Sequence, residues 1–189
     1  WDMDQQRASS ISEIWDDKPA VIGFGSITCD STEHHFIYFK ELMEQYSDQF
    51  DFAFVYIREA HAADAWDSSS IGKKSRTVDA KTDQIRRNVC DRFQTKVNSQ
   101  SRMFVDSVDD RAAVAYAAWP SRYYVISPKG EVLYHGGGPG PWGVRLKEHG
   151  SYINFSSEPE LEKLFGESIR SAGTLETFLK RYLKELETR

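Results

Sequence analysis

A chain of 189 residues, 40% hydrophobic and 13% aromatic, is long and apolar enough for one core, so we expect a single domain over residues 1–189. The net charge of -5, with no basic stretch interleaved with aromatics, argues against nucleic acid as a partner. Two cysteines, outside any CxxC pair or zinc-like spacing, predict no disulfide framework, no metal and no bound cofactor.

The first clear pattern is a βαβ unit that follows a polar arm. Residues 1–18 are polar and predict an arm or a short leading helix. The runs at 20–24 and 52–57 are apolar without alternation, which is typical of strands covered on both faces. Residues 30–47 between them have helical periodicity. We therefore expect two parallel strands joined by a helix.

The helix at 30–47 has a defined inward face and a predicted start. Its apolar residues at three- and four-residue spacing are Phe36, Phe39, Met43 and Tyr46. Asp30 and Glu33 are spaced as an acidic variant of the capping box. His34 and His35 are expected on the solvated side of this helix.

The middle of the chain predicts further strands and helices after a long polar stretch. That stretch, residues 58–76, is long for a connection and is therefore expected to be functional. The following elements are a helix at 78–96 with Ile85, Val89 and Phe93 inward, a strand at 103–106, a small helix at 110–117, and a hairpin of strands 123–126 and 131–134. Pro128 and Gly130 suit the hairpin turn.

The C-terminal part reads as an insertion followed by a covering helix. The insertion spans about residues 145–173 and contains a predicted helix near 158–170. The last predicted helix, 174–187, is amphipathic and should cover the sheet. Its apolar face is made of Leu175, Phe178, Leu179, Tyr182, Leu183 and Leu186.

This element order predicts an α/β fold of the thioredoxin-like, peroxiredoxin-related kind, with a central mixed sheet flanked by helices. Ligands in open α/β sheets bind at the carboxyl ends of the strands. Cys29, the residues after Ile57 and those before Tyr123 should converge on that edge.

Cys29 lies between the first predicted strand and the first predicted helix. Unpaired amides in the first helical turn and the positive end of the helix dipole stabilise a thiolate over a thiol. Free cysteines are also common as inert core residues. The neighbours favour the nucleophile, because Gly25 permits an unusual turn and Ser26 and Thr28 offer hydroxyl groups.

Three blocks of sequence resemble the iodothyronine deiodinase family. Residues 25–29 read Gly-Ser-Ile-Thr-Cys, residues 56–66 read Tyr-Ile-Arg-Glu-Ala-His-Ala-Ala-Asp-Ala-Trp, and residues 115–122 read Ala-Tyr-Ala-Ala-Trp-Pro-Ser-Arg. The blocks occur in the family's order, and Cys29 takes the position of the family's selenocysteine. The resemblance covers about residues 19–142 and the final helix.

The resemblance implies reductive removal of iodine from an aromatic ring, as in thyroid hormone metabolism. It further implies a homodimer, an external thiol as reductant and an iodothyronine-like or iodotyrosine-like substrate. The family's proteins carry an N-terminal membrane anchor, which would precede Trp1, and we expect a reducing, cytosol-facing compartment.

The sequence also departs from the family at three places. Asp30 stands where the family has proline, next to the nucleophile. The family's second histidine falls at or near Lys74. Residues 145–173 have no family counterpart.

The resemblance assigns catalytic roles around Cys29. Cys29 would attack iodine, and His61 would donate the proton to the ring carbon, with Glu59 orienting it or relaying a proton. Ser26 and Thr28 either donate hydrogen bonds to the thiolate or only shape the turn.

Other residues are assigned to substrate binding or to the frame of the site. Arg122 would pair with a substrate carboxylate or form a surface salt bridge. Tyr56 would shape a ring pocket or fill the core, and Trp66 would contact substrate. Trp119-Pro120 resembles the cis-proline that faces the reactive cysteine in thioredoxin-like folds, although trans is the statistical default. Cys90 is expected to be unpaired, with a resolving role as the minor alternative.

Two rival functions remain open from the sequence. A thiol peroxidase of the peroxiredoxin type would use Cys29 on peroxide with Arg122 beside it. Against this, Ile22 stands at the proline position of such enzymes. The other rival is a noncatalytic interaction protein of the same fold.

Overall fold

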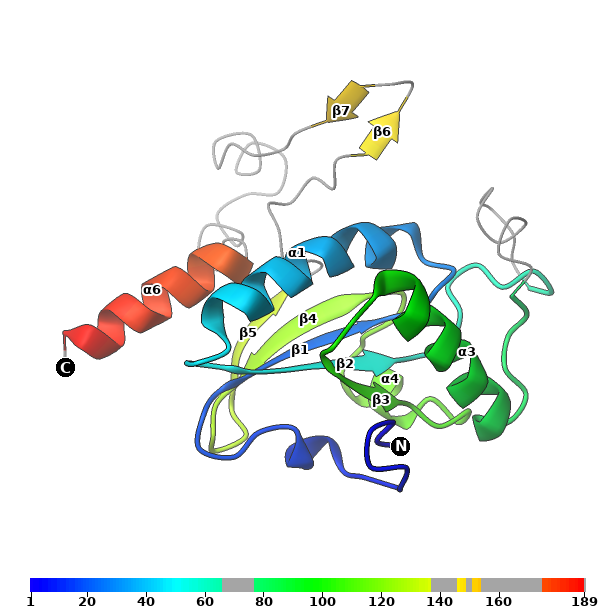
Figure 1. Cartoon of the computed structure of the whole chain (residues 1–189), viewed down its shortest axis with the longest axis horizontal. Helices are drawn as coiled ribbons and strands as arrows, with labels where there is room; N and C mark the ends of the chain where they lie inside the picture. The colour runs from blue at the N-terminus through cyan, green and yellow to red at the C-terminus, as the bar shows by residue number, and fades with distance from the viewer. Residues whose placement is uncertain (66–76, 137–145, 149–150, 154–174, 189) are drawn as a thin grey trace.

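The computed structural model describes residues 1–65, 77–136, 146–148, 151–153 and 175–188 (Figure 1). Its elements are η1 (Ile11–Glu13), β1 (Ala20–Gly25), α1 (Asp30–Tyr46), β2 (Asp51–Tyr56), α3 (Asp83–Val97), β3 (Arg102–Val105), α4 (Arg111–Ala115), β4 (Arg122–Ile126), β5 (Val132–Gly136), β6 (Leu146–Glu148), β7 (Ser151–Ile153) and α6 (Leu175–Glu187).

Five strands form one mixed sheet in the order β3-β2-β1-β4-β5. β1, β2 and β3 are parallel, whereas β4 runs antiparallel to β1 and β5 antiparallel to β4. Helices α1, α3 and α6 cover one face, and α4 lies on the other (Figure 1). This arrangement confirms the predicted thioredoxin-like α/β fold with a central mixed sheet flanked by helices.

The βαβ unit forms as its pattern predicts. All six residues of β1 are buried, as expected for a central strand. Gly25 ends this strand because a Cβ there would lie 2.2 Å from Oγ1 of Thr32. The missing side chain lets the first turn of α1 pack directly on the end of β1, which fixes where Cys29 lies.

Helix α1 differs from the prediction at its start and on one face. Its N-cap is Cys29, so the predicted capping box of Asp30 and Glu33 is wrong; the helix begins one residue earlier than that motif requires. His35 was expected in solvent but is buried, with its ring edge-on to Tyr123 at 6.2 Å between centroids. The side chains of Asp30 and His34 lie outside those that the structure describes.

Helix α3 begins later than predicted. Thr82 is its N-cap and accepts a hydrogen bond from the Ile85 amide, so the helix starts at Asp83 rather than near residue 78. Ile85 then falls in the first turn and is 41% exposed, contrary to the prediction that it is a core position. Val89 and Phe93 are buried as predicted.

The hairpin and the last helix complete the sheet's cover. Gly130 in the β4–β5 turn has a φ of +82°, which explains a glycine there. In α6, Leu175 and Phe178 are buried, but Leu186 is 49% exposed because the helix extends past the edge of the sheet (Figure 1). Within the predicted insertion, β6 pairs with β7. The predicted helix at 158–170 lies outside the described residues.

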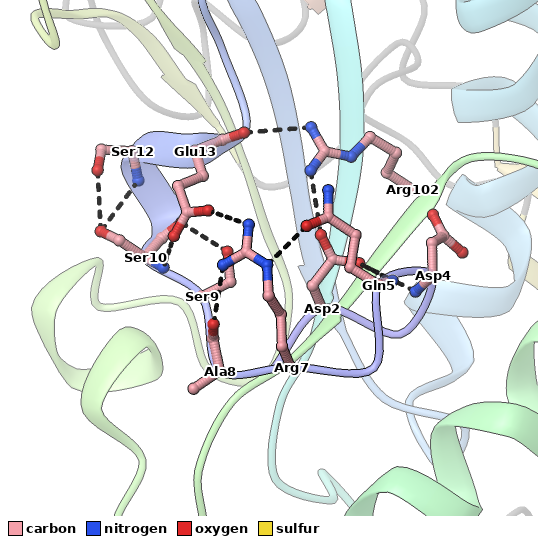
Figure 2. A network of polar contacts seen from close by, with 10 residues as sticks. All are labelled: Asp2, Asp4, Gln5, Arg7, Ala8, Ser9, Ser10, Ser12, Glu13 and Arg102. Atoms are coloured by element: carbon pink, nitrogen blue, oxygen red, sulfur yellow. Dashed lines mark hydrogen bonds and ion pairs between the residues drawn. The ribbon is translucent and has the colours of Figure 1, made fainter.

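The arm at residues 1–18 holds only the short η1 turn and is fixed to the sheet edge by polar contacts (Figure 2). The Met3 amide donates to the Met103 carbonyl oxygen at 2.9 Å. The Arg102 guanidinium donates to Oδ2 of Asp2 at 3.1 Å and to the Glu13 carbonyl oxygen at 3.2 Å. We call Asp2, Arg7, Glu13 and Arg102 the arm network. No helix in the described ranges is long and apolar enough to cross a membrane.

Candidate active site

Cys29 occupies the N-cap position of α1, at the end of the loop that follows β1. Its side chain is 4% exposed and makes no capping hydrogen bond. The Cys29 amide donates to the Ser26 carbonyl oxygen at 3.2 Å, and its own carbonyl oxygen accepts from the Thr32 amide. Cys29 therefore lies at the N-terminal, positive end of a 17-residue helix.

Glu59 is the centre of a buried polar network beside Cys29. Thr28 donates to Oε2 of Glu59 twice, from its amide at 3.2 Å and from its hydroxyl at 2.6 Å. The Tyr56 hydroxyl donates to Oε1 of Glu59. The Thr28 hydroxyl in turn accepts from the His61 amide at 3.1 Å. We call Thr28, Tyr56, Glu59 and His61 the Glu59 network.

The pKa of Glu59 is raised above the ordinary value for a glutamate. Burial is the main cause, and the hydrogen bonds from Thr28 and Tyr56 offset it in part by lowering the pKa. Among the described residues no lysine or arginine forms an ion pair with this carboxylate. A carboxyl group in this state can hold a proton at higher pH than an exposed one.

Three loops are tied together around this network. The Ser26 hydroxyl accepts from the Ala60 amide at 3.2 Å, and the Tyr56 hydroxyl accepts from the Ile27 amide at 3.0 Å. Nε1 of Trp119 donates to the Glu59 carbonyl oxygen at 3.3 Å. The loops after β1, after β2 and before β4 therefore meet at one edge of the sheet, as the topology predicts.

The Trp119-Pro120 peptide bond is cis, as the resemblance implied and against the statistical default. The indole contact to Glu59 could not be predicted from local sequence patterns, because it joins residues 60 positions apart. The Trp119 ring is 43% exposed, so an aromatic face borders the site.

Six of the predicted site residues are brought together here: Ser26, Thr28, Cys29, Tyr56, Glu59 and His61. Of the two roles predicted for Thr28, donation to the thiolate does not fit, because its hydroxyl hydrogen goes to Glu59. Tyr56 is fully buried and packs on Phe93 at 5.6 Å between ring centroids. It therefore holds Glu59 rather than presenting a face to a ligand.

Arg122 begins β4 and lies in register with Phe24 at the end of β1. Its Nε atom is buried and has no hydrogen-bond partner in the described part of the chain. The predicted alternative, a surface salt bridge, does not form with any described residue. Trp66 and Lys74 lie outside the described residues.

Cys90 lies on α3 and is fully buried in the core. Both cysteines are free, as expected. Burial strongly raises the pKa of the Cys90 thiol, so it stays protonated and enclosed. This state argues against a resolving role. Within the described residues no three His, Cys, Asp or Glu side chains form a group that could hold a metal.

The amino-acid sequence and the fold of this chain are similar to those of known proteins. Human type II iodothyronine deiodinase is 30% identical over 157 residues, which cover 79% of this chain and 56% of the relative. The type II enzyme of Fundulus heteroclitus is 30% identical over 146 residues, covering 74% and 53%. The chain thus spans about half the length of these relatives. A solved thiol-disulfide oxidoreductase from Bacteroides fragilis is 13% identical, with a TM-score of 0.49 over 87% of this chain and 93% of its own.

The sequence model of the family described as iodothyronine deiodinase matches residues 3–155. This match includes all three blocks of sequence and every residue of the Glu59 network. The chain therefore belongs to the iodothyronine deiodinase family.

Proposed function

We propose that this chain catalyses the reductive deiodination of iodinated aromatic compounds, iodothyronine-like or iodotyrosine-like, with Cys29 as nucleophile. The observation that carries the proposal is the placement of Cys29 at the N-cap of α1, beside a buried carboxyl group that forms no ion pair with any described lysine or arginine. Family membership supports the same chemistry.

The first step is attack of the Cys29 thiolate on iodine. A sulfur–iodine bond forms, the carbon–iodine bond breaks, and its electron pair stays on the ring carbon. The carbon takes up a proton, so the ring is reduced and the sulfur is oxidised to a sulfenyl iodide.

The Glu59 network supplies that proton. Glu59 holds a proton at higher pH than an exposed glutamate does, because burial raises its pKa. Thr28 bridges Glu59 and the backbone of His61 through one hydroxyl, which keeps the histidine close to the carboxyl group. His61 then acts as the donor to the ring carbon.

External thiol regenerates the enzyme. One thiol attacks the sulfenyl iodide and releases iodide, leaving a mixed disulfide at Cys29, and a second thiol reduces this disulfide. Cys90 is too deeply buried to replace the external thiol. The atoms and electrons of this reaction balance without a bound cofactor.

The substrate lies between charged and aromatic groups. The Arg122 guanidinium would pair with a substrate carboxylate, and the exposed Trp119 ring would stack on the iodinated ring. Trp66 stays a predicted contact. The homodimer, the membrane anchor before Trp1 and the reducing, cytosol-facing compartment also stay predictions from the family resemblance.

The test is to supply a thiol reductant with an iodothyronine, an iodotyrosine or peroxide in turn, and to measure iodide release and peroxide loss. We expect iodide from at least one iodinated phenol and none from Cys29→Ala. Cys90→Ala serves as the matched control and should retain activity. Absence of iodide from every iodinated phenol, or equal release by Cys29→Ala, contradicts the proposal. Peroxide consumption alone would identify a thiol peroxidase.

A further inference from the structure

The loop that carries Glu59 and His61 is held to the rest of the protein from two sides. On one side, the Ala60 amide donates to the Ser26 hydroxyl at 3.2 Å and the His61 amide donates to the Thr28 hydroxyl at 3.1 Å. These bonds join the loop to the segment that precedes the nucleophile. The other side carries ion pairs to which the proposed mechanism gives no role.

Arg58 directly precedes Glu59 and spans two carboxylates. Nη2 of Arg58 lies 3.7 Å from Oδ2 of Asp79, and Nη1 lies 3.5 Å from Oδ2 of Asp110. The Arg58 side chain is 48% exposed, whereas those of Asp79 and Asp110 are 20% and 17% exposed. A planar guanidinium with several donors can serve two carboxylates at once. Arg58 therefore ties the start of the loop both to the segment before α3 and to the beginning of α4.

The Asp110 carboxylate is itself fixed from the core side. Its Oδ1 lies 2.8 Å from Nη1 of Arg86, whose side chain is 3% exposed. Nη1 of Arg86 also donates to the Ser107 carbonyl oxygen at 2.6 Å. An ion pair between two mobile surface side chains contributes little, because ordering both costs entropy. Arg58 instead meets a partner that a buried arginine already holds in place.

The segment that contains Asp79 binds both ends of the loop. The Asp79 side chain faces Arg58, and its amide donates to Oδ1 of Asp64 at 2.8 Å. The Ala63 amide donates to the Thr77 carbonyl oxygen at 2.8 Å. Positions 58 and 63–64 are therefore both attached to residues 77–79. Both members of the proposed proton path lie between these two attachments.

We propose that Arg58 and Asp79 form a clamp that positions Glu59 and His61 for proton transfer, which rests on the function proposed above. Among the described residues Arg58 is the only cation in an ion pair with Asp79, and Oδ1 of this carboxylate is buried without a hydrogen-bond partner there. Without Arg58, a partly buried charge loses its counter-ion, which favours displacement of the segment. Arg58 and Asp79 are positioning residues, because they act through the loop and not on the substrate.

Steady-state kinetics of iodide release at saturating thiol test the clamp. Arg58→Gln should lower kcat about tenfold and leave KM within about twofold, because displaced groups lose transition-state contacts before they lose affinity. Asp79→Asn should cost about threefold, since Arg58 keeps its contact with Asp110. Arg58→Lys keeps the charge but has one nitrogen, so it should restore part of the loss.

The double variant separates a shared clamp from two independent effects. If Arg58 and Asp79 act as one unit, Arg58→Gln with Asp79→Asn should be no slower than Arg58→Gln alone, about tenfold below the parent. Additive losses, about thirtyfold together, or a loss confined to KM would overturn the proposal.

Arg111→Gln is the matched control. Nε of Arg111 lies 2.7 Å from Oδ2 of Asp109, which is a shorter ion pair than either formed by Arg58. The side chain is 83% exposed and neither partner binds the loop of Glu59. Kinetic constants should stay at parent values. An equal fall in kcat in this control would mean that general electrostatics, and not the clamp, cause the loss.

Hydrogen exchange of single amides, followed by NMR in the folded chain, tests the position of the loop directly. In Arg58→Gln the Ala60 and His61 amides should exchange about threefold to tenfold faster, because the bonds that they donate open more often. The Ile57 amide donates to the Gly25 carbonyl oxygen within the sheet at 3.0 Å and should keep its rate. Unchanged exchange at Ala60 and His61, or faster exchange with unchanged kcat, overturns the proposal.

Hydrogen exchange uses no iodinated compound. Iodide release by the parent with unchanged exchange in the variants would overturn only the clamp. Faster exchange in variants of a parent that releases no iodide would support the clamp and contradict the proposed deiodination.

Discussion

The Glu59 network and the arm network (Figure 2) both join carboxylates to backbone amides, but their carboxyl groups end with opposite pKa shifts. Burial pushes the pKa of Asp2 upward, yet bonds from the Gln5 amide, Arg102 and the Asp4 amide bring it below its ordinary value. Burial also raises the pKa of Glu59, and neutral donors do not reverse it. For Asp2 the Gln5 amide makes the largest contribution that lowers the pKa and Arg102 makes the next largest, whereas the described donors to Glu59 are all neutral.

This contrast separates structural from chemical roles. The arm network keeps its carboxylates ionised, so they act as fixed anchors for the arm at the sheet edge. Glu59 is left able to gain and lose a proton, next to a cysteine at a helix N-terminus. Among the described residues Glu59 has no cationic partner, and carboxyl groups with perturbed pKa values are common at active sites.

The largest effect on activity should come from replacing His61, the residue of the Glu59 network that is proposed to donate the proton. His61→Ala should lower kcat for iodide release about 100- to 10,000-fold, because a general acid contributes that range, while KM changes little. Steady-state kinetics at saturating thiol would measure both constants. A loss confined to KM would contradict the role of proton donor.

Glu59→Gln should lower kcat by about 30- to 100-fold, because the amide cannot hold the transferred proton. The substitution should also change how the free energy of unfolding depends on pH. A raised native pKa means that wild-type stability relative to the variant is greatest below the unfolded pKa and falls as pH rises through the native pKa. Melting temperatures of both proteins between pH 4 and 8 measure this difference.

The matched control for this substitution is Glu13→Gln in the arm network. The pKa of Glu13 is lowered to about 2, chiefly by the hydrogen bond from Arg7. Its contribution to the free energy of unfolding therefore changes with pH in the opposite direction to that of Glu59. That contribution is present above the unfolded pKa and is lost as pH falls toward 2. It should be small, since the pair is exposed, and activity should not change. The same pH trend in both variants would remove the contrast between the networks.

Tyr56→Phe tests whether the neutral donors set the state of Glu59. Loss of one bond that lowers the pKa should raise the Glu59 pKa further, so the pH-dependent stability difference moves to higher pH. The Ile27 amide also loses its acceptor, and we expect a loss of about 1–3 kcal/mol in unfolding free energy. If the weakened network stabilises the transition state less by about 1 kcal/mol, kcat should fall about fivefold. Melting curves of Tyr56→Phe with and without Glu59→Gln would show the shift.

Local patterns were enough to predict β1, α1 and β2, because burial on both faces or on one helical face leaves a direct trace in the sequence. The start of α3 was missed because Thr82, a strong N-cap, follows residues that are also compatible with a helix. The burial of His35 could not be predicted, since its partner Tyr123 comes from a strand 88 positions later in the chain.

The members of the site were predicted from the three blocks of sequence, but their contacts were not. The donors to Glu59 come from the end of β2 and from the loop after β1, so they meet only when the parallel strands pair. The hydroxyl of Thr28 had two open roles in the sequence, and only the distance to Glu59 separates them. Residue types are local information, whereas the direction of a hydrogen bond depends on the fold.

The smallest effect on activity should follow from breaking the arm network. Asp2→Ala removes the acceptor for the Asp4 and Gln5 amides and the partner of Arg102. We expect unfolding free energy to fall by about 1–3 kcal/mol, measured by denaturant titration, while kcat stays within about twofold. Asp2 is fully buried, but the Gln5 amide, Arg102 and the Asp4 amide lower its pKa, so it stays ionised and does not take part in proton transfer. A large fall in kcat at full folding would mean that the arm acts on the site and that cation pairing does not separate the two networks.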